Sequence, residues 1–218
     1  MIDKPKIRVV LWRHGQTNWN VENRYQGHSD IPLNEVGLYQ VGHAAKVLAG
    51  MNPTRIIASD LIRTQQTAQA LVDLTNIKLE IDPDLRETNG GNWEGKTGAQ
   101  NREEDGERFK QWMFGEDVRA GETGESRSAV AKRARSAIDR GTTESSGTII
   151  FVTHGGTSRA LLGSILDLPF EKWAALGGLS NASWSVLEPN IFTNSGWTLV
   201  EHNAGSIPEP VIGNEAPA

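Results

Sequence analysis

The chain has 218 residues, of which 37% are hydrophobic, and this is enough to bury one sizeable core. Its formal net charge is −5 at pH 7, so it lacks the overall basic field with which proteins hold nucleic acid or an anionic membrane. It contains no cysteine, which excludes disulfides, thiol catalysis, cysteine-ligated zinc and iron–sulfur clusters. Any anion site must therefore be built locally.

The N-terminal residues carry no targeting signal. Residues 1–6 are charged where a secretory signal needs an apolar run, and no later stretch approaches the ~20 apolar residues of a membrane span. We therefore expect a cytoplasmic protein that binds neither a membrane nor nucleic acid. In such a protein the glycosylation sequon at Asn181 has no chemical meaning.

The first half of the chain alternates short β-branched runs with amphipathic stretches. A run too brief for a helix indicates a buried strand, whereas apolar residues at helical spacing behind Ser, Asp or Asn indicate a helix. The predicted elements are a strand over 7–12, a helix capped at Asn34 that continues to about 49, a strand over 55–58, a helix capped by Ser59 and Asp60 that continues to 72, and a weaker strand over 78–81.

The second half is less regular. Residues 88–98 are polar and glycine-rich, and two helix-like stretches within 103–138 are broken by an acidic, glycine-rich loop over 115–126. We interpret residues 97–145 as a helical insertion. The remaining predictions are a strand over 148–153, a helix over 159–166, antiparallel strands over 183–187 and 197–200, one domain over 1–203 and a Pro/Gly-rich tail over 204–218.

Alternating strands and helices predict an α/β fold with three α/β/α layers and a mostly parallel central sheet. In such sheets ligands bind beyond the carboxyl ends of the strands. Two predicted strands end directly in His-Gly, at His14 and at His154. If these strands are parallel neighbours, the two imidazoles meet at one end of the sheet.

Five side chains at predicted strand ends and helix starts form a candidate site: Arg13, His14, Arg63, Glu87 and His154. Arginine offers planar, paired donors that suit the non-bridging oxygens of a phosphate. One neutral imidazole could attack phosphorus if an acceptor holds its second nitrogen, while the other donates to the equatorial oxygens. Departure of an alkoxide needs a proton, for which Glu87 is the candidate donor.

Two other interpretations of these residues have to be considered. Asp84, Glu94 and Glu125 are nearby acids, and residue chemistry alone does not rank Glu87 above them. Residues 90–97 formally fit the phosphate-loop pattern G-x-x-x-x-G-K-[ST]. We reject that match because a phosphate loop follows a hydrophobic strand and opens a helix, whereas polar residues precede this one.

Several short motifs follow one another from about Val9 to Leu187. They are Arg13-His14-Gly15-Gln16-Thr17-x-x-Asn20, Gln26-Gly27, Ser59-Asp60-Leu61-x-Arg63-Thr64, Leu85-Arg86-Glu87, Gly124-Glu125-Ser126 and Thr153-His154-Gly155-Gly156. Together, and in this order, they resemble the histidine phosphatase superfamily, the phosphoglycerate mutase-like clan. One such motif arises by chance, whereas several in order are specific.

The resemblance implies a phosphoglycerate mutase-like fold and a reaction that needs no metal and no cofactor. It implies His14 as the phosphorylated nucleophile and Glu87 as the proton donor. The phosphate ligands that it implies are Arg13, Arg63 and His154, and the residues around the phosphate and leaving group are Asn20, Gln26, Gly27 and Gly155.

The resemblance favours a phosphatase acting on a small phosphorylated metabolite. Residues 168–184 are similar to actinobacterial members of the superfamily, some of which remove phosphate from a glucosylated glycerate. No proline-rich insertion follows Glu87, and the basic residues that hold the glycerate carboxylate in mutases are not matched.

Three alternatives stay open: a mutase-type phosphotransferase, a non-catalytic phospho-ligand binding protein, and a metal hydrolase, for which no H-E-x-x-H spacing exists. We also expect a homodimer, with residues 173–184 as its contact surface.

Overall fold

The computed structural model describes residues 7–205 and contains a six-stranded sheet with the order β3-β2-β4-β1-β5-β6. Neighbours among β1, β2, β3 and β4 are parallel. β5 is antiparallel to β1, and β6 is antiparallel to β5. The strands are β1 (Ile7–Arg13), β2 (Pro53–Ala58), β3 (Leu79–Ile81), β4 (Gly147–Thr153), β5 (Trp184–Pro189) and β6 (Trp197–Ala204).

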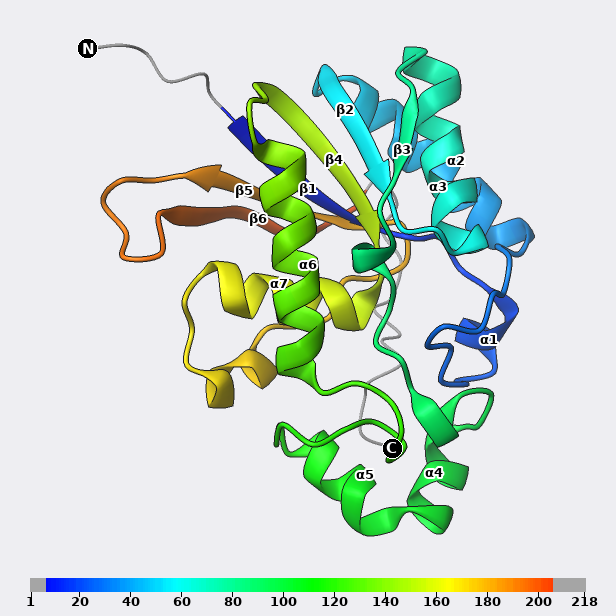
Figure 1. Ribbon diagram of the computed structural model, residues 1–218. Coiled ribbons are helices and arrows are strands. Elements are labelled where there is room, and N and C mark those ends of the chain that lie inside the picture. The colour runs from blue at the N-terminus through cyan, green and yellow to red at the C-terminus, as the bar shows by residue number, and fades with distance from the viewer. Residues whose placement is uncertain (1–6, 206–218) are drawn as a thin grey trace.

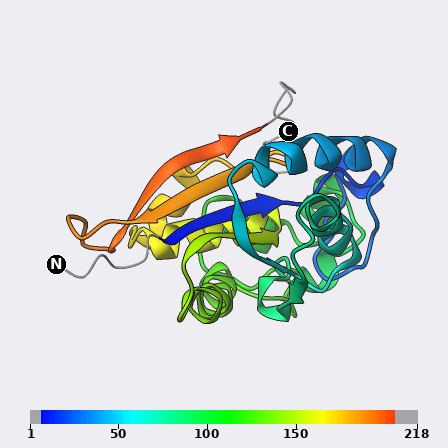
Figure 2. The same cartoon turned by 90° about the horizontal axis from the view of Figure 1, so that it is seen from above.

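Helices cover both faces of this sheet (Figure 1). Seen from above, α2 lies on one side of β1 and α6 lies on the other (Figure 2). The predicted three-layer α/β/α architecture with a mostly parallel sheet is therefore confirmed. The α-helices are α1 (Asn18–Val21), α2 (Glu35–Ala49), α3 (Ile62–Thr75), α4 (Gly98–Glu104), α5 (Gly106–Met113), α6 (Arg127–Thr142) and α7 (Gly155–Ile165), and the 3-10 helices are η1 (Pro83–Leu85), η2 (Gly91–Trp93) and η3 (Phe170–Ala175).

The two central strands are buried on both faces, which explains their continuous hydrophobic runs. Successive side chains of a strand point to opposite faces. Val10 and Trp12 accordingly pack into a core with α2 and α3, whereas Val9 and Leu11 pack into a second core with α6 and α7. Burial therefore fixes the position of β1 and β4, and with it the position of whatever follows each strand.

Two helix starts differ from the prediction. The structure begins α3 behind Leu61, which makes no side-chain cap, and the N–H of Ile62 donates to Asp30 Oδ1 at 2.6 Å. Asp60 pairs instead with Arg86, so the predicted Ser59-Asp60 cap is wrong. An acid from a distant loop supplies the cap, and the local sequence does not contain that information.

The structure also begins α7 at Gly155, directly after β4, and not at Arg159 as predicted. His154 is the N-cap residue but makes no side-chain cap, and the carboxylate of Glu87 accepts from the first amides instead. Two glycines at the start of the helix concealed its beginning, because glycine is a poor helix former.

The predicted insertion divides into two parts. α4 and α5 lie beyond the carboxyl ends of the parallel strands (Figure 1), where Trp93, Phe109 and Trp112 form a separate apolar cluster. α6 packs on the sheet as part of the main core. The boundary of the insertion and the tail over 204–218 stay predictions, since residues 206–218 lie outside the described part of the chain. Within residues 7–205, no helix is long and apolar enough to span a membrane.

Candidate active site

The two histidines meet at the carboxyl end of the sheet. His14 follows β1 and His154 follows β4, and these parallel neighbours pair Arg13 with Thr153. The ring centroids lie 5.3 Å apart, and the side chains are 2% and 0% exposed. The expectation that the imidazoles come together is confirmed.

The environment of His14 selects one neutral tautomer. Its Nδ1 lies 2.7 Å from the carbonyl oxygen of Gly15, and a carbonyl only accepts, so Nδ1 carries the hydrogen. The other nitrogen, Nε2, keeps its lone pair. Burial, followed by the charges of Arg63 and Arg13, holds the pKa of His14 well below 6.5, and the Gly15 carbonyl opposes this only in part. Near pH 7 the ring is therefore neutral and has the form that a nucleophile requires.

The environment of His154 selects the opposite tautomer. Arg63 Nε lies 3.2 Å from His154 Nδ1, and a guanidinium only donates, so this Nδ1 accepts and Nε2 carries the hydrogen. Burial, then the charges of Arg63 and His14, holds the pKa of His154 well below 6.5. Its Nε2 is buried and has no hydrogen-bond partner among the described residues. A buried N–H group without an acceptor costs free energy. This N–H therefore marks a place where an acceptor atom of a bound ligand would complete the hydrogen bond.

Arg63 is held from behind by a loop. Its Nη1 donates to the carbonyl of Ser29 and its Nη2 to the carbonyl of Gly27, both at 2.8 Å. The side chain is fully buried, and burial lowers the pKa of Arg63 to about 10, so the guanidinium remains charged at neutral pH. The loop turns at Gly27, whose φ of +50° suits glycine.

Asn20 contributes a second unpaired donor. Its Oδ1 accepts from the N–H and the hydroxyl of Thr17 and from the amide of Asn181, at 3.0, 3.1 and 3.2 Å. Because donors surround this atom, it is the oxygen of the side-chain amide, and the other terminal atom of the amide is the nitrogen Nδ2. Asn20 Nδ2 is buried and has no hydrogen-bond partner within residues 7–205. The oxygen of the Thr17 hydroxyl lies at the same distance, 3.1 Å, from Gln26 Oε1, so its single hydrogen is shared between the two amide oxygens and links the two predicted substrate residues.

Arg13 lies over the start of α7. A Cβ added to Gly155 would meet Arg13 Cζ and Nε at 3.3 Å, so any other residue would push the guanidinium a few tenths of an ångström away from the helix backbone. The N-terminus of a helix carries partial positive charge and free amides, and it binds anions. Arg13, Arg63 and the N-terminus of α7 thus concentrate positive potential beside the two imidazoles.

The carboxylate of Glu87 also lies at the N-terminus of α7. Its Oε2 accepts from the N–H of Gly156 at 3.1 Å, and its Oε1 accepts from the N–H and the hydroxyl of Thr157 at 3.0 and 3.2 Å. The negative charge of Glu87 raises the pKa of Arg63 against the larger effect of burial. Because His154 is the N-cap of α7, the carboxylate of Glu87 lies on the first amides after this histidine.

The three rival acids have other partners. Asp84 pairs with Arg140 on the surface, and Glu125 pairs with Arg133. Glu94 accepts four hydrogen bonds from the N–H groups of residues 28, 29 and 90 and from the Ser29 hydroxyl. Each therefore stabilises a loop or a surface contact, whereas Glu87 accepts from the first amides that follow His154.

Residues 179–183, whose role the sequence did not reveal, bind the backbone of Arg13 and His14 and the side chain of Arg13. Arg13 donates from its N–H to Ser183 O at 2.9 Å and from Nη1 to Leu179 O at 2.5 Å. Asn181 Nδ2 donates to the carbonyl of His14 at 3.2 Å, in addition to its bond with Asn20. The only feature of the sequence that indicated this role of Asn181 is that a polar residue stands directly before the buried residues 182–187.

The dimer contact surface that we expected over residues 173–184 stays a prediction, but the two tryptophans at its ends do not take part in it as exposed side chains. Trp173 and Trp184 are 8% and 4% exposed within the single chain, so they pack inside it. Burial of these apolar side chains against η3, α7 and the sheet competes with their use between chains.

Arg13, Arg63, the N-terminus of α7 and the two neutral imidazoles form a cradle that could hold a phosphoryl group, and the carboxylate of Glu87 lies at the same helix N-terminus. In the described part of the chain, no three His, Cys, Asp or Glu side chains come together as a metal site. Comparison with known proteins agrees with the geometry: the family model of the histidine phosphatase superfamily (branch 1) matches residues 9–205. The chain is a member of this superfamily.

Relatives within the histidine phosphatase superfamily include phosphatases and a probable mutase. Glucosyl-3-phosphoglycerate phosphatase of Mycobacterium tuberculosis is 40% identical over 83% of this chain and 84% of its own. The enzyme of that name from Mycolicibacterium vanbaalenii is 37% identical over 91% of this chain and 95% of its own. A probable phosphoglycerate mutase of Yersinia pestis is 34% identical over 88% and 91%.

The fold agrees with solved members of the superfamily. A mycobacterial glucosyl-3-phosphoglycerate phosphatase solved with VO3 is 36% identical and has a TM-score of 0.84, over 91% of this chain and 99% of that one. The phosphoglycerate mutase-like fold is therefore confirmed. Histidine phosphatases work through a phosphohistidine, and the present chain is an enzyme of this hydrolase class.

Proposed function

We propose that the chain is a metal-independent phosphatase that hydrolyses glucosyl-3-phosphoglycerate through a phosphohistidine on His14. The observation that carries the proposal is the opposite tautomers of the two buried imidazoles. His14 presents a lone pair on Nε2, and His154 presents an N–H on Nε2 that has no acceptor in the described structure. A nucleophile and a donor beside each other are what attack on a phosphoryl group needs. The choice of substrate is supported by the relatives of 37–40% identity that carry this name.

In the first step, His14 Nε2 attacks phosphorus as the bond to the ester oxygen breaks. Glu87 enters this step as the protonated carboxylic acid and gives its proton to the departing alkoxide, which leaves as the alcohol, so that Glu87 becomes a carboxylate. The equatorial oxygens gather negative charge, which Arg13, Arg63 and the N–H of His154 stabilise. The phosphorylated imidazole is cationic, and its Nδ1–H remains bonded to the Gly15 carbonyl, which stabilises that charge.

In the second step, water attacks the phosphohistidine. Glu87, now ionised, takes a proton from this water, and the bond between phosphorus and Nε2 breaks. His14 returns to its neutral tautomer and inorganic phosphate leaves. The sum is one ester and one water converted to one alcohol and one phosphate, so neither a metal nor a cofactor is required.

The test measures phosphate release from glucosyl-3-phosphoglycerate, 3-phosphoglycerate, phosphoserine and p-nitrophenyl phosphate in excess chelator. Wild type is compared with His14→Ala and with His43→Ala, a control histidine that stacks on Tyr39 in α2. We expect one preferred ester, no turnover by His14→Ala and normal turnover by His43→Ala. Rapid acid-free quenching with labelled ester should trap phosphate on His14.

Other outcomes would point elsewhere. Conversion of 3-phosphoglycerate to its isomer without phosphate release would establish a mutase. Tight phosphate binding without turnover of any ester, by a folded wild type, would establish a binding protein. Turnover that stops in chelator and returns with a divalent ion would contradict the metal-independent mechanism.

We further propose that the enzyme works in the cytoplasm as a homodimer and does not bind nucleic acid. The net charge of −5 supports a small metabolite over nucleic acid as partner. Val36, Tyr39 and Val47 are exposed on one side of α2 and support a contact between copies. Sedimentation equilibrium should give twice the mass of one chain, and a single-chain mass at micromolar concentration would contradict the dimer.

A further inference from the structure

Arg133 lies on α6, outside the cradle, and makes three of its hydrogen bonds to one short segment of backbone. Its Nη1 donates to the carbonyls of Asp84 and Arg86, both at 2.7 Å, and its Nη2 donates to the carbonyl of Glu87 at 2.9 Å. These three carbonyls belong to the turn that carries the candidate acid. The main chain of Glu87 is thus bonded to α6, while its carboxylate is bonded to the N-terminus of α7.

The remaining donors of Arg133 form a two-point pair with Glu125. Arg133 Nε and Nη2 lie 2.8 Å from Glu125 Oε1 and Oε2, and the side chains are only 17% and 25% exposed. Although burial works in the opposite direction, hydrogen bonds from Arg133 and from the N–H of Asn89 hold the pKa of Glu125 below its ordinary value. The pair is therefore ionised at neutral pH. Such paired contacts fix the plane of the guanidinium, which a single contact would leave free to rotate.

Glu125 fixes the far end of the same turn. Its Oε2 accepts from the N–H of Asn89 at 2.9 Å, and its own N–H donates to the carbonyl of Asn89 at 2.9 Å. The turn over residues 84–89 is consequently bonded at both ends to Arg133 and Glu125. His28 adds one more contact, because its Nε2 lies 2.9 Å from the carbonyl of Glu87.

We propose that Arg133, held by Glu125, is a positioning residue for the general acid Glu87. Arg133 does not act on the phosphate; it sets where the carboxyl group of Glu87 lies relative to the departing oxygen. A misplacement of a reacting group by ~1 Å costs on the order of 100-fold in rate. The inference rests on the proposed function, in which Glu87 donates the proton.

A comparison of two substrates with different leaving groups distinguishes a misplaced general acid from a general loss of structure. An alkyl phosphate needs a proton on its departing oxygen, whereas p-nitrophenolate is stable enough to leave without one. The specificity constant kcat/KM includes only the steps through departure of the alcohol. The ratio of the two constants, measured on one preparation, does not depend on how much of the protein is folded.

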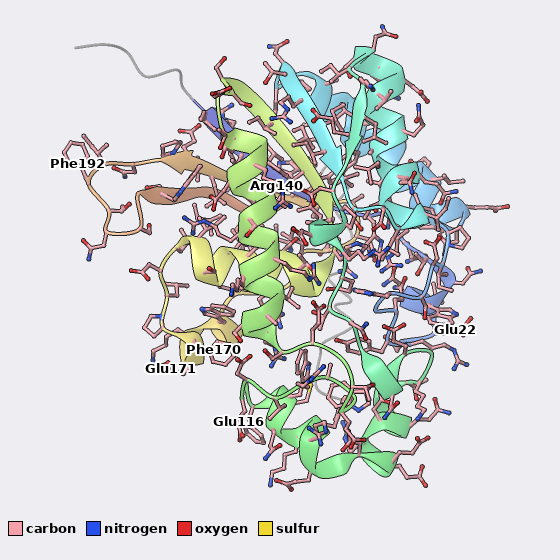
Figure 3. The ribbon with its side chains drawn as sticks, viewed as in Figure 1. Glu22, Glu116, Arg140, Phe170, Glu171 and Phe192 are labelled. Carbon is pink, nitrogen blue, oxygen red and sulfur yellow. The ribbon has the colours of Figure 1, made fainter. Side chains whose placement is uncertain are left out.

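The variants are Arg133→Lys, Glu125→Gln, Glu87→Gln and the control Arg140→Lys. Lysine keeps the charge of Arg133 but has no planar fork of donors. Arg140, labelled on α6 in Figure 3, comes seven residues after Arg133, which is about two helical turns. Its side chain is 53% exposed and contacts the same region of the chain, but through the carboxylates of Asp82 and Asp84. It therefore matches Arg133 in charge, helix and neighbour without touching the carbonyls that lead to Glu87.

We expect Glu87→Gln to lower kcat/KM for glucosyl-3-phosphoglycerate by about 10²- to 10⁴-fold, the usual contribution of a general acid, with much less effect on p-nitrophenyl phosphate. Arg133→Lys should lower the constant for the sugar ester by about 10- to 100-fold and that for the aryl ester by less than about 3-fold. Glu125→Gln should change the ratio in the same direction, and Arg140→Lys should leave it unchanged.

The outcomes separate the two proposals. Suppose that Glu87→Gln changes the ratio of the two kcat/KM values, but Arg133→Lys lowers both values equally or leaves both unchanged. The positioning role is then wrong and the proposed function stands. If Glu87→Gln lowers both constants equally, the acid is misassigned and the positioning role of Arg133 is overturned with it, whereas hydrolysis through His14 stands. A wild type that hydrolyses neither ester overturns the proposed function and the inference with it.

Discussion

The unpaired amide of Asn20 leads to a prediction about two residues that are distant in sequence. Three donors hold Asn20 Oδ1, so Nδ2 is left to bond an oxygen of the bound anion. A hydrogen bond to a charged group contributes about 1.5 to 3 kcal/mol. Asn20→Ala should therefore weaken inhibition by inorganic phosphate by about 10- to 150-fold, at 1.4 kcal/mol for each factor of ten.

Asn181→Ala should act on phosphate binding mainly through Asn20. It removes one of the three donors to Asn20 Oδ1, and the amide becomes freer to rotate. The carbonyl of His14 also loses a bond, but the N–H of Ala182 still donates to it at 3.1 Å. We expect Asn181→Ala to raise the inhibition constant several-fold, on the order of one neutral hydrogen bond of ~1 kcal/mol.

The assay is a double-mutant cycle on the inhibition constant of phosphate, with p-nitrophenyl phosphate as substrate. In the Asn20→Ala background, Asn181→Ala should change the constant by less than about 2-fold, because residues that act through one another are not additive. If the two effects simply multiply, Asn181 influences the anion independently of Asn20, and the reasoning from the saturated oxygen is refuted.

The histidine pair predicts a pH-dependent stability: both pKa values are held below 6.5 in the folded chain, so the unfolded chain binds more protons below that pH. The full stability is present above pH 6.5, and each histidine should lower the free energy of unfolding by about 1 to 1.5 kcal/mol between pH 7.5 and 5.5. Urea midpoints measured at both pH values check this. A midpoint that falls equally in wild type and in the His14→Asn, His154→Asn double variant would contradict it. Gly156→Ala places a methyl group 2.7 Å from Glu87 Oε1, so it should displace the carboxylate and lower kcat/KM for the sugar ester by about 10- to 100-fold, while phosphate inhibition stays unchanged. Dialysis against a chelator should leave turnover within error of the untreated enzyme, and a loss restored by one divalent ion would exclude the mechanism.

The strands and most helices follow from local patterns. Runs such as 7–12 and 148–153 are apolar because both faces of β1 and β4 are covered, and Asn34 caps α2 as predicted. The errors occur where a distant residue supplies the cap. Asp30 completes α3 and Glu87 completes α7, and neither contact leaves a trace in the sequence next to the helix.

The candidate site was predictable to the extent that its residues end strands or follow motifs. His14 and His154 meet because their strands are neighbours, which hydrophobic patterning and chain order indicate. The supporting residues were not predictable in this way. Asn181 and Arg133 act through backbone carbonyls, and any residue type offers a carbonyl, so no pattern marks the partner.

The position of β1 in the sheet has a consequence for the order in which the chain acquires its chemistry. β1 is made first, but both of its neighbours, β4 and β5, come from the last third of the chain. Contacts so distant in sequence form slowly, and only after the intervening residues exist. A nascent chain that ends before Leu179 carries His14 without the segment that holds Arg13 and Asn20. The surroundings of His14 are thus completed only after residues 179–183 have been made.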